Sequence, residues 1–381
     1  MNRSVAAAAV LSCVSAAAFA QSTAPSLFDT ILNIGDDPSA GVVFDATNVG
    51  GGTGNVSLSN LTGNVLGQRS QLNVYSGGTV AQNFTVGLSS TQQGTVSATV
   101  LNLFGGTLGR RVSVENGAVL NVMGGFVTRS PINEAINVRG GLLNVSGGEI
   151  DGDVDVFANS TVNITGGDLG TVDVRANTAV TVSGGLVNQL FTRGSADVLV
   201  DGGSVRSLDI GSSEVTVTDG AHGGGFVFDG AVVNVTGGTF DRSFDVERGT
   251  LNISGGILDG SRLLTAGSGV INLSGGMIGS RLDIRDGTKL NIFGTEFFLD
   301  GVEITGLEFN EAFRIDDRSV SEPLILSGLL ADGSAFAFDL GTDNSGDEFE
   351  SGATLTITRV PAPGAALAFA ASGLFAARRR R

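Results

Sequence analysis

A six-residue pattern of alternating apolar and polar positions returns about every 18 residues through the middle of the chain. Its first and third positions are apolar, a polar residue usually lies between them, and two glycines usually close it. The alternation predicts a short strand with one apolar face, and the glycines predict a sharp corner after it. The clearest copies begin at Leu143, Val162, Val180, Val198, Val215, Val233, Leu251, Ile271 and Leu290, and looser copies begin at Leu72, Leu101 and Leu120.

A second apolar–polar alternation lies between many of these copies, beginning at Val154, Val172, Leu208, Phe244 and Leu282. Each unit is therefore expected to contain a strand, a glycine corner, a second strand and a looser polar corner. No apolar stripe of helical period fits into the gaps, which excludes alternating strand–helix folds and leucine-rich repeats.

A short unit without a helix cannot bury its own apolar face, whereas units stacked as a parallel β-helix can. At about 4.8 Å per coil, roughly 12 coils fit between Leu72 and Leu290. We expect a right-handed solenoid, because the interval between copies is uneven, being shorter from Val198 to Val215 than from Leu251 to Ile271. Left-handed solenoids usually keep a stricter six-residue sub-repeat. A propeller is the alternative, although each of its blades needs about 40 residues.

The segments around the repeats differ in pattern and composition. Residues 21–50 show no copy of the pattern and are expected to cap the N-terminal end of repeats that cover residues 51–295. Residues 296–359 are rich in phenylalanine and contain a hairpin-like pair at 324–330 and 334–340, which predicts a small C-terminal β cap.

Residues 1–20 have the composition of a secretory signal peptide. Arg3 precedes an apolar run over residues 5–18, and the small residues Ala18 and Ala20 place the cleavage site before Gln21. The one cysteine, Cys13, lies inside this segment. Lipoprotein processing at Cys13 is a weaker alternative, and cleavage before Gln21 would leave neither a disulfide nor a thiol nucleophile.

Residues 360–381 combine a short proline motif, an apolar run over residues 365–377 and a basic end. The motif consists of Val360, Pro361, Ala362, Pro363 and Gly364, and the basic end consists of Arg378, Arg379, Arg380 and Arg381. This tail resembles the PEP-CTERM sorting signal of bacteria, except that Ala362 stands where that family usually has Glu. The resemblance implies recognition by an exosortase, a membrane enzyme, and delivery to an exopolysaccharide matrix.

Helix geometry agrees with a transient role for the apolar run. Thirteen residues span about 20 Å as a helix, which is short of the ~30 Å hydrocarbon core. The four arginines would stay on the cytoplasmic side during this transient membrane contact. The alternative is a tail anchor that is never processed.

Charge narrows the choice of partners. Without Arg3 and the four terminal arginines, 17 basic residues face 38 acidic ones, a net charge of −21. Such a surface repels nucleic acid. The chain has no tryptophan and one tyrosine, which makes an aromatic platform for sugars hard to assemble, and Phe226, Phe228 and Phe244 are interpreted as core residues.

The candidates for catalytic or metal-binding residues are aspartates that recur at the same position in the second strand of the repeat unit. The residues are Asp155, Asp173, Asp209, Asp245 and Asp283. Asp155 and Asp173 on adjacent coils would suit a retaining carboxylate pair or a shared calcium ion. We favour a solvated row that recurs by duplication, and therefore assign no catalytic, cofactor or metal residue. Weak calcium binding at acidic corners such as residues 151–155 stays open, and His222 is interpreted as an exposed corner residue.

Asparagine occupies the second position of many copies and is interpreted as structural. Stacked side-chain amides can hydrogen-bond from coil to coil and fix the register. The residues are Asn121, Asn144, Asn163, Asn234, Asn252, Asn272 and Asn291.

These features favour an exported structural or adhesin-like protein of the extracellular matrix or cell surface, with a membrane-anchored intermediate. The expected partners are a signal peptidase, an exosortase-like enzyme, and an extracellular polysaccharide or the cell envelope. A carbohydrate-active β-helix enzyme and a carbohydrate-binding module are the alternatives. A compact groove of Asp with Arg or Lys on one face would favour the enzyme.

Overall fold

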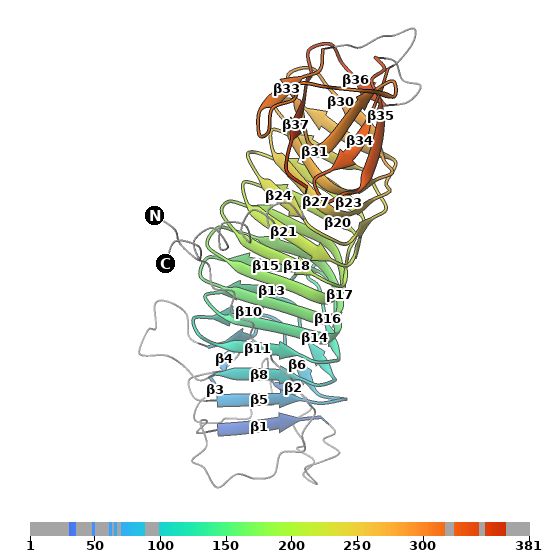
Figure 1. Cartoon of the computed structure of the whole chain (residues 1–381). Helices are drawn as coiled ribbons and strands as arrows, with labels where there is room; N and C mark the ends of the chain where they lie inside the picture. Colours follow the sequence, from blue (N-terminus) through green and yellow to red (C-terminus); the bar gives the residue numbers. More distant parts are fainter. Residues whose placement is uncertain are drawn as a thin grey trace, which may run out of the picture.

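The computed structural model describes residues 30–35, 48–49, 61–62, 65–66, 70–87, 99–316, 324–342 and 347–362. These residues form strands and no helix, and the strands stack in parallel into an elongated β-solenoid of about ten turns spaced about 19 residues apart (Figure 1). The predicted parallel β-helix is thus confirmed, while its handedness stays a prediction. The predicted cleavage residues and residues 363–381 of the tail lie outside the described part.

Three parallel sheets run the length of the solenoid, and the repeated six-residue pattern forms the first of them. In this asparagine sheet, inward Leu143 and Val145 are buried while Asn144 between them is half-buried. Its strands are β1 (Thr30–Ile34), β5 (Ser70–Val74), β8 (Val100–Leu103), β11 (Val119–Val122), β14 (Leu142–Ile150), β16 (Thr161–Val174), β17 (Ala179–Arg193), β18 (Asp197–Asp201), β21 (Glu214–Asp219), β24 (Val232–Val235), β27 (Thr250–Leu258), β29 (Val270–Ile278), β31 (Lys289–Leu299) and β37 (Thr354–Arg359).

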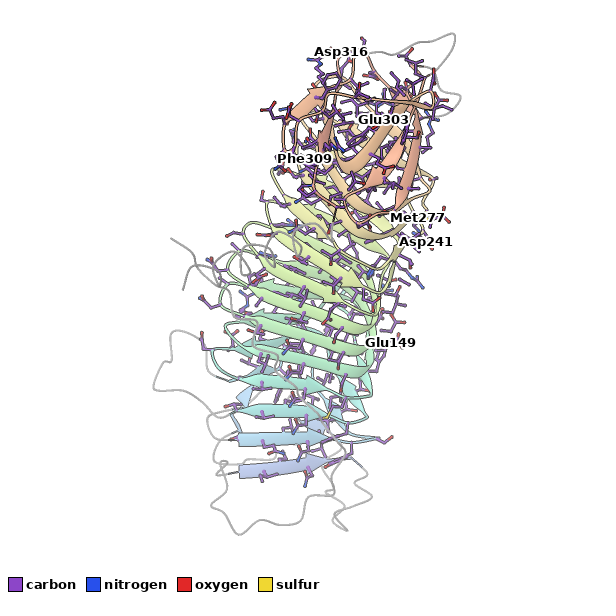
Figure 2. All side chains as sticks on the ribbon, in the orientation of Figure 1. Glu149, Asp241, Met277, Glu303, Phe309 and Asp316 are labelled. Carbon is purple, nitrogen blue, oxygen red and sulfur yellow. The ribbon has the colours of Figure 1, made fainter. Side chains whose placement is uncertain are left out.

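A short sheet follows the glycine corner, with one inward residue per coil. The ends of β14, β27 and β29 and the middles of β16 and β17 belong to it. Outward positions such as Glu149 and Met277 lie at the surface (Figure 2). Its separate strands are β2 (Asn48–Val49), β6 (Thr79–Val80), β9 (Thr107–Leu108), β12 (Phe126–Val127), β19 (Ser204–Val205), β22 (Ala221–His222) and β25 (Thr239–Phe240).

The third sheet, called the aspartate sheet below, carries the second predicted alternation. The last residues of β16 and β17 belong to it. Its separate strands are β4 (Val65–Leu66), β7 (Thr85–Val86), β10 (Val112–Glu115), β13 (Glu134–Arg139), β15 (Asp153–Phe157), β20 (Ser207–Gly211), β23 (Gly224–Phe228), β26 (Phe244–Glu247), β28 (Arg262–Ala266), β30 (Arg281–Ile284) and β36 (Glu348–Phe349).

The predicted amide ladder is confirmed on the outer side of the asparagine sheet. Each side-chain Nδ2 donates to the Oδ1 of the preceding coil over 2.7 to 2.9 Å. One ladder runs through Asn33, Asn73, Asn102, Asn121, Asn144 and Asn163, and a second through Asn234, Asn252, Asn272 and Asn291. Between them the position is filled by Thr181, Leu199 and Thr216.

The first rung comes earlier than the sequence pattern suggested. Residues 21–50 were expected to hold no copy, but β1 pairs in parallel with β5, and Asn33 accepts a hydrogen bond from Asn73. Leu32 and Ile34 fill the core there. That part of the interpretation is wrong, because a single short copy far along the chain from its partner strand gives no visible periodicity.

A small β cap follows β31. It contains β32 (Val302–Glu303), β33 (Ala312–Arg314) and the predicted hairpin of β34 (Ile325–Leu330) and β35 (Ala335–Asp339). β34 pairs antiparallel with β31, while β36 and β37 return to the solenoid register on β30 and β31. β3 (Leu61–Thr62) forms an antiparallel pair with β4 near the other end.

Candidate functional site

The repeated aspartates lie in one outward row of the aspartate sheet, as the sequence predicted. Asp155 pairs directly with Asp173 on the next coil. Further along, the row alternates between acidic and apolar residues: Phe191, Asp209, Phe226, Asp245, Leu264 and Asp283. Direct carboxylate neighbours among the five predicted aspartates therefore occur only at Asp155 and Asp173.

Arginines two residues along the strand neutralise this pair. Arg175 Nη2 lies 3.1 Å from Asp155 Oδ1 and 3.8 Å from Asp173 Oδ2, and Arg193 Nη2 lies 3.5 Å from the same Asp173 oxygen. The two aspartate side chains are only 13% and 12% exposed. The expected solvated row is therefore wrong at this place, because neighbouring side chains cover the carboxylates and the arginines pair with them.

Burial also changes how these carboxyl groups titrate. It raises the pKa of Asp155, although Arg175 opposes the shift and Asp173 adds to it. Burial likewise raises the pKa of Asp153, where a hydrogen bond from Thr171 opposes the shift. Carboxyl groups of raised pKa beside guanidinium groups can exchange protons with a polar ligand or hold adjacent coils together.

Phenylalanines join the arginines on the same face. The Phe157 ring lies between the guanidinium groups of Arg139 and Arg175, at 3.9 and 4.3 Å, and Arg193 lies 4.5 Å from the centre of Phe191. Such cation–π contacts favour ordered side chains. We call the outward residues Arg139, Asp153, Asp155, Phe157, Asp173, Arg175, Phe191 and Arg193 the aspartate face.

Two of the three phenylalanines interpreted as core residues are not fully buried. Phe226 is 53% exposed in the outward row, and Phe228 is partly exposed and lies 6.1 Å from Phe191 between ring centres. Phe244 does belong to the core. Phe226 and Phe228 lie on either side of the inward Val227, so the two-residue alternation of a strand places both of them outward. The same alternation in the sequence could have distinguished them from Phe244.

Calcium coordination at the acidic corners receives no support from the geometry. In the described ranges no three His, Cys, Asp or Glu side chains come together as a metal site. At residues 151–155, Asp151 faces Arg129 at 3.6 Å, and Asp155 faces Arg175.

His222 was interpreted as an exposed corner residue, and this is wrong. It is 3% exposed, occupies an inward position of the short sheet, and packs against Phe240 with ring centres 5.2 Å apart. Its Nδ1 accepts from the Val205 N–H at 3.2 Å, and its Nε2 lies 2.9 Å from the Asp219 carbonyl oxygen. The ring is therefore neutral and fixed in the tautomer that donates from Nε2.

Acid is expected to weaken the fold through this imidazole. Burial lowers the pKa of His222, so the unfolded chain binds the proton more tightly than the folded one. The stabilisation is complete above the unfolded pKa of about 6.5 and declines as pH falls below it. His222 is the one histidine in the chain. Melting temperatures measured between pH 8 and 5 should fall more for the wild type than for His222→Leu, and equal slopes would contradict this role.

The C-terminal motif starts directly after β37, the last of the described strands. β37 pairs with β31 up to Arg359, and the Val360 N–H donates to the Gly294 carbonyl at 2.8 Å. Pro361 and Ala362 are exposed, while Pro363 and Gly364 lie outside the described residues. No helix in the described part of the chain is long and apolar enough to cross a membrane.

Comparison with known proteins identifies no relative: no family model, no curated protein and no solved structure matches the chain. The fold and the surface define a class instead. The molecule is an acidic parallel β-solenoid with amide ladders on one face, an ion-paired aromatic strip on another, and a small β cap.

Proposed function

We propose that the protein is an exported structural or adhesin-like component of the cell surface or extracellular matrix. In this proposal a signal peptidase removes residues 1–20, and an exosortase-like enzyme recognises the tail that begins at Val360. The observation that carries the proposal is the tail sequence, which starts directly after the last described strand and has exposed residues at Pro361 and Ala362. A long acidic solenoid with flat sides suits contact with an extended polysaccharide rather than a small substrate.

Substituting the two prolines of the motif tests whether the tail directs sorting. In the cells that make the protein, the wild type should reach the matrix or medium, whereas the double variant Pro361→Ala and Pro363→Ala should stay with the membrane fraction. Pro131→Ala, which changes an exposed proline of the solenoid, is the matched control and should behave as the wild type. Equal distribution of the tail variant and the wild type would count against sorting through this motif.

Carbohydrate recognition at the aspartate face is the second candidate function. It is favoured by the close Asp155, Asp173, Arg175 and Arg193 group beside Phe157, which has the residue types named above for a carbohydrate-active enzyme. With matrix polysaccharide as the probe, loss of new reducing ends in Asp155→Asn would indicate an enzyme. Loss of co-sedimentation in Phe157→Ala without any cleavage would indicate a binding module. If neither effect is seen, both the enzyme and the binding module are excluded.

A further inference from the structure

The cap hairpin leaves a strand edge open. Within the described ranges β35 pairs with β34 alone. Leu330 donates to the Ser334 carbonyl and Leu340 to the Leu324 carbonyl, each over 2.8 Å. Hydrogen-bonded and non-hydrogen-bonded pairs alternate along an antiparallel ladder. Even-numbered residues of β35 therefore turn their backbone groups towards β34, and odd-numbered residues turn theirs away.

The outward groups belong to Ala335, Ala337 and Asp339. The Asp339 N–H donates to Asp347 Oδ2 at 3.0 Å, whereas no hydrogen bond within the described residues engages the outward groups of the two alanines. Open edges normally carry charges, prolines or bulges that block a further strand. Exposed alanines do not block one.

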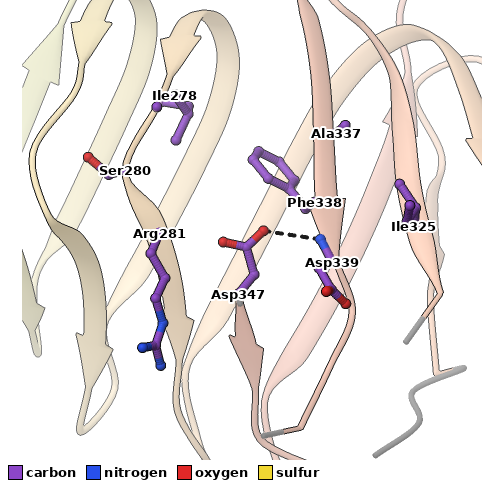
Figure 3. Close-up of a pocket in the computed structure, with 9 residues that line it drawn as sticks. Ile278, Ser280, Arg281, Ile325, Ala337, Phe338, Asp339 and Asp347 are labelled. Atoms are coloured by element: carbon purple, nitrogen blue, oxygen red, sulfur yellow. Dashed lines mark hydrogen bonds between the residues drawn. The ribbon is translucent and has the colours of Figure 1, made fainter. Parts of the chain in front are cut away.

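A cavity of about 460 Å³ lies along this edge (Figure 3). Ala337 and Phe338 of β35 and Ile325 of β34 line one side, and residues 278–281, from the end of β29 to the start of β30, line the other. Ile325 is 50% exposed and so adds apolar surface at its rim.

Acidic side chains outnumber basic ones at the same place. Among the residues that the structure describes, Asp339 Oδ1 is buried without a hydrogen-bond partner, and Asp347 also lines the cavity. Arg281 also lines the cavity and pairs with Glu348 at 3.2 Å, so two carboxylates of the lining, Asp339 and Asp347, lie beside one arginine. A buried carboxylate oxygen without a partner is costly, and a cationic donor from a ligand would satisfy it.

We propose that this groove binds an extended peptide that adds as a strand to β35 and places a lysine or arginine against Asp339. Strand addition supplies main-chain hydrogen bonds, and the acidic groove selects the side chain. The site does not depend on export or on the sorting tail. Its partner is a basic, extended segment of another protein.

Synthetic peptides test this proposal directly. The probes are fluorescent nine-residue peptides of alternating threonine and valine with a central lysine or a central glutamate, measured by anisotropy with the full chain. The lysine peptide should bind at least tenfold more tightly than the glutamate peptide. N-methylation of alternate amides in the lysine peptide should abolish binding, because it removes the donors of the added strand.

Variants of the strand edge distinguish the contribution of main-chain hydrogen bonds to peptide binding from that of the Asp339 charge. Ala337→Pro removes the outward N–H at an edge position that tolerates proline and should weaken binding at least tenfold, whereas Ala337→Ser should not. Asp339→Asn should remove the preference for lysine. Unchanged binding to Ala337→Pro with an unaltered melting temperature, or no binding of the lysine peptide at millimolar concentration, would overturn the proposal. Dimerisation of the protein alone, lost in Ala337→Pro, would instead identify a second copy as the occupant.

Discussion

Gly147→Ala is expected to destabilise the solenoid by up to about 3 kcal/mol, since overpacking a close backbone approach forces the coils apart. Gly147 lies at the corner within β14. A Cβ there would lie 2.6 Å from the carbonyl oxygen of Met123 on the preceding coil, and a backbone atom cannot move aside as a side chain can. Chemical denaturation should show a lower midpoint, and hydrogen exchange should show faster opening at β11 and β14.

Gly117→Ala separates this steric effect from backbone conformation. Gly117 has φ +72° and nothing within 4 Å of the position that a Cβ would take, so alanine should cost only about 1 kcal/mol through its left-handed conformation. Gly147 itself does not have a positive φ, so equal losses for the two variants would show that its close approach to Met123 costs no more than a left-handed alanine.

Asn144→Ala should cost about 2 kcal/mol, the second largest effect expected in the repeats, because truncation removes two hydrogen bonds that contribute about 1 kcal/mol each. The Asn144 side chain donates to Asn121 at 2.8 Å and accepts from Asn163 at 2.9 Å. The variant also leaves two half-buried groups to be satisfied by water. Differential scanning calorimetry should therefore show a clear loss of thermal stability.

Two further variants serve as a control and as the converse test of the amide ladder. Asn188→Ala changes an exposed asparagine of β17 outside the ladder and should shift stability by less than about 0.5 kcal/mol. Thr181→Asn should add a rung, because Thr181 pairs in register with Asn163. If Asn144→Ala and Asn188→Ala had equal effects, the ladder would contribute nothing beyond ordinary surface amides.

The regular repeat of the apolar–polar pattern explains why so much of the fold could be predicted from the sequence. Apolar residues equivalent to Leu143 and Val145 recur from coil to coil, with asparagine between them in most copies. An alternation of this kind that repeats about every 18 residues leaves few architectures besides a stacked solenoid. The same argument predicted the amide ladder and the aspartate row, because register places equivalent residues directly over one another.

Features that occur only once along the chain could not be predicted from the repeat. β1 lies far ahead of its partner β5 in the sequence, and β36 and β37 rejoin the solenoid only after the cap. His222 was judged by its glycine-rich surroundings and not by its alignment with Val205 and Phe240 in the inward column. The ion pairs of the aspartate face were missed although Arg175 follows Asp173 by two residues, the spacing that places both side chains on one face.

Export and processing can be tested by the intact mass of the protein recovered from the cells that make it. We expect a chain in the matrix or medium that begins at Gln21, contains the whole solenoid through β37, and lacks the apolar run and the four terminal arginines. A chain that retains residues 365–381 and remains in the membrane fraction would contradict processing of the tail and leave an anchored surface solenoid.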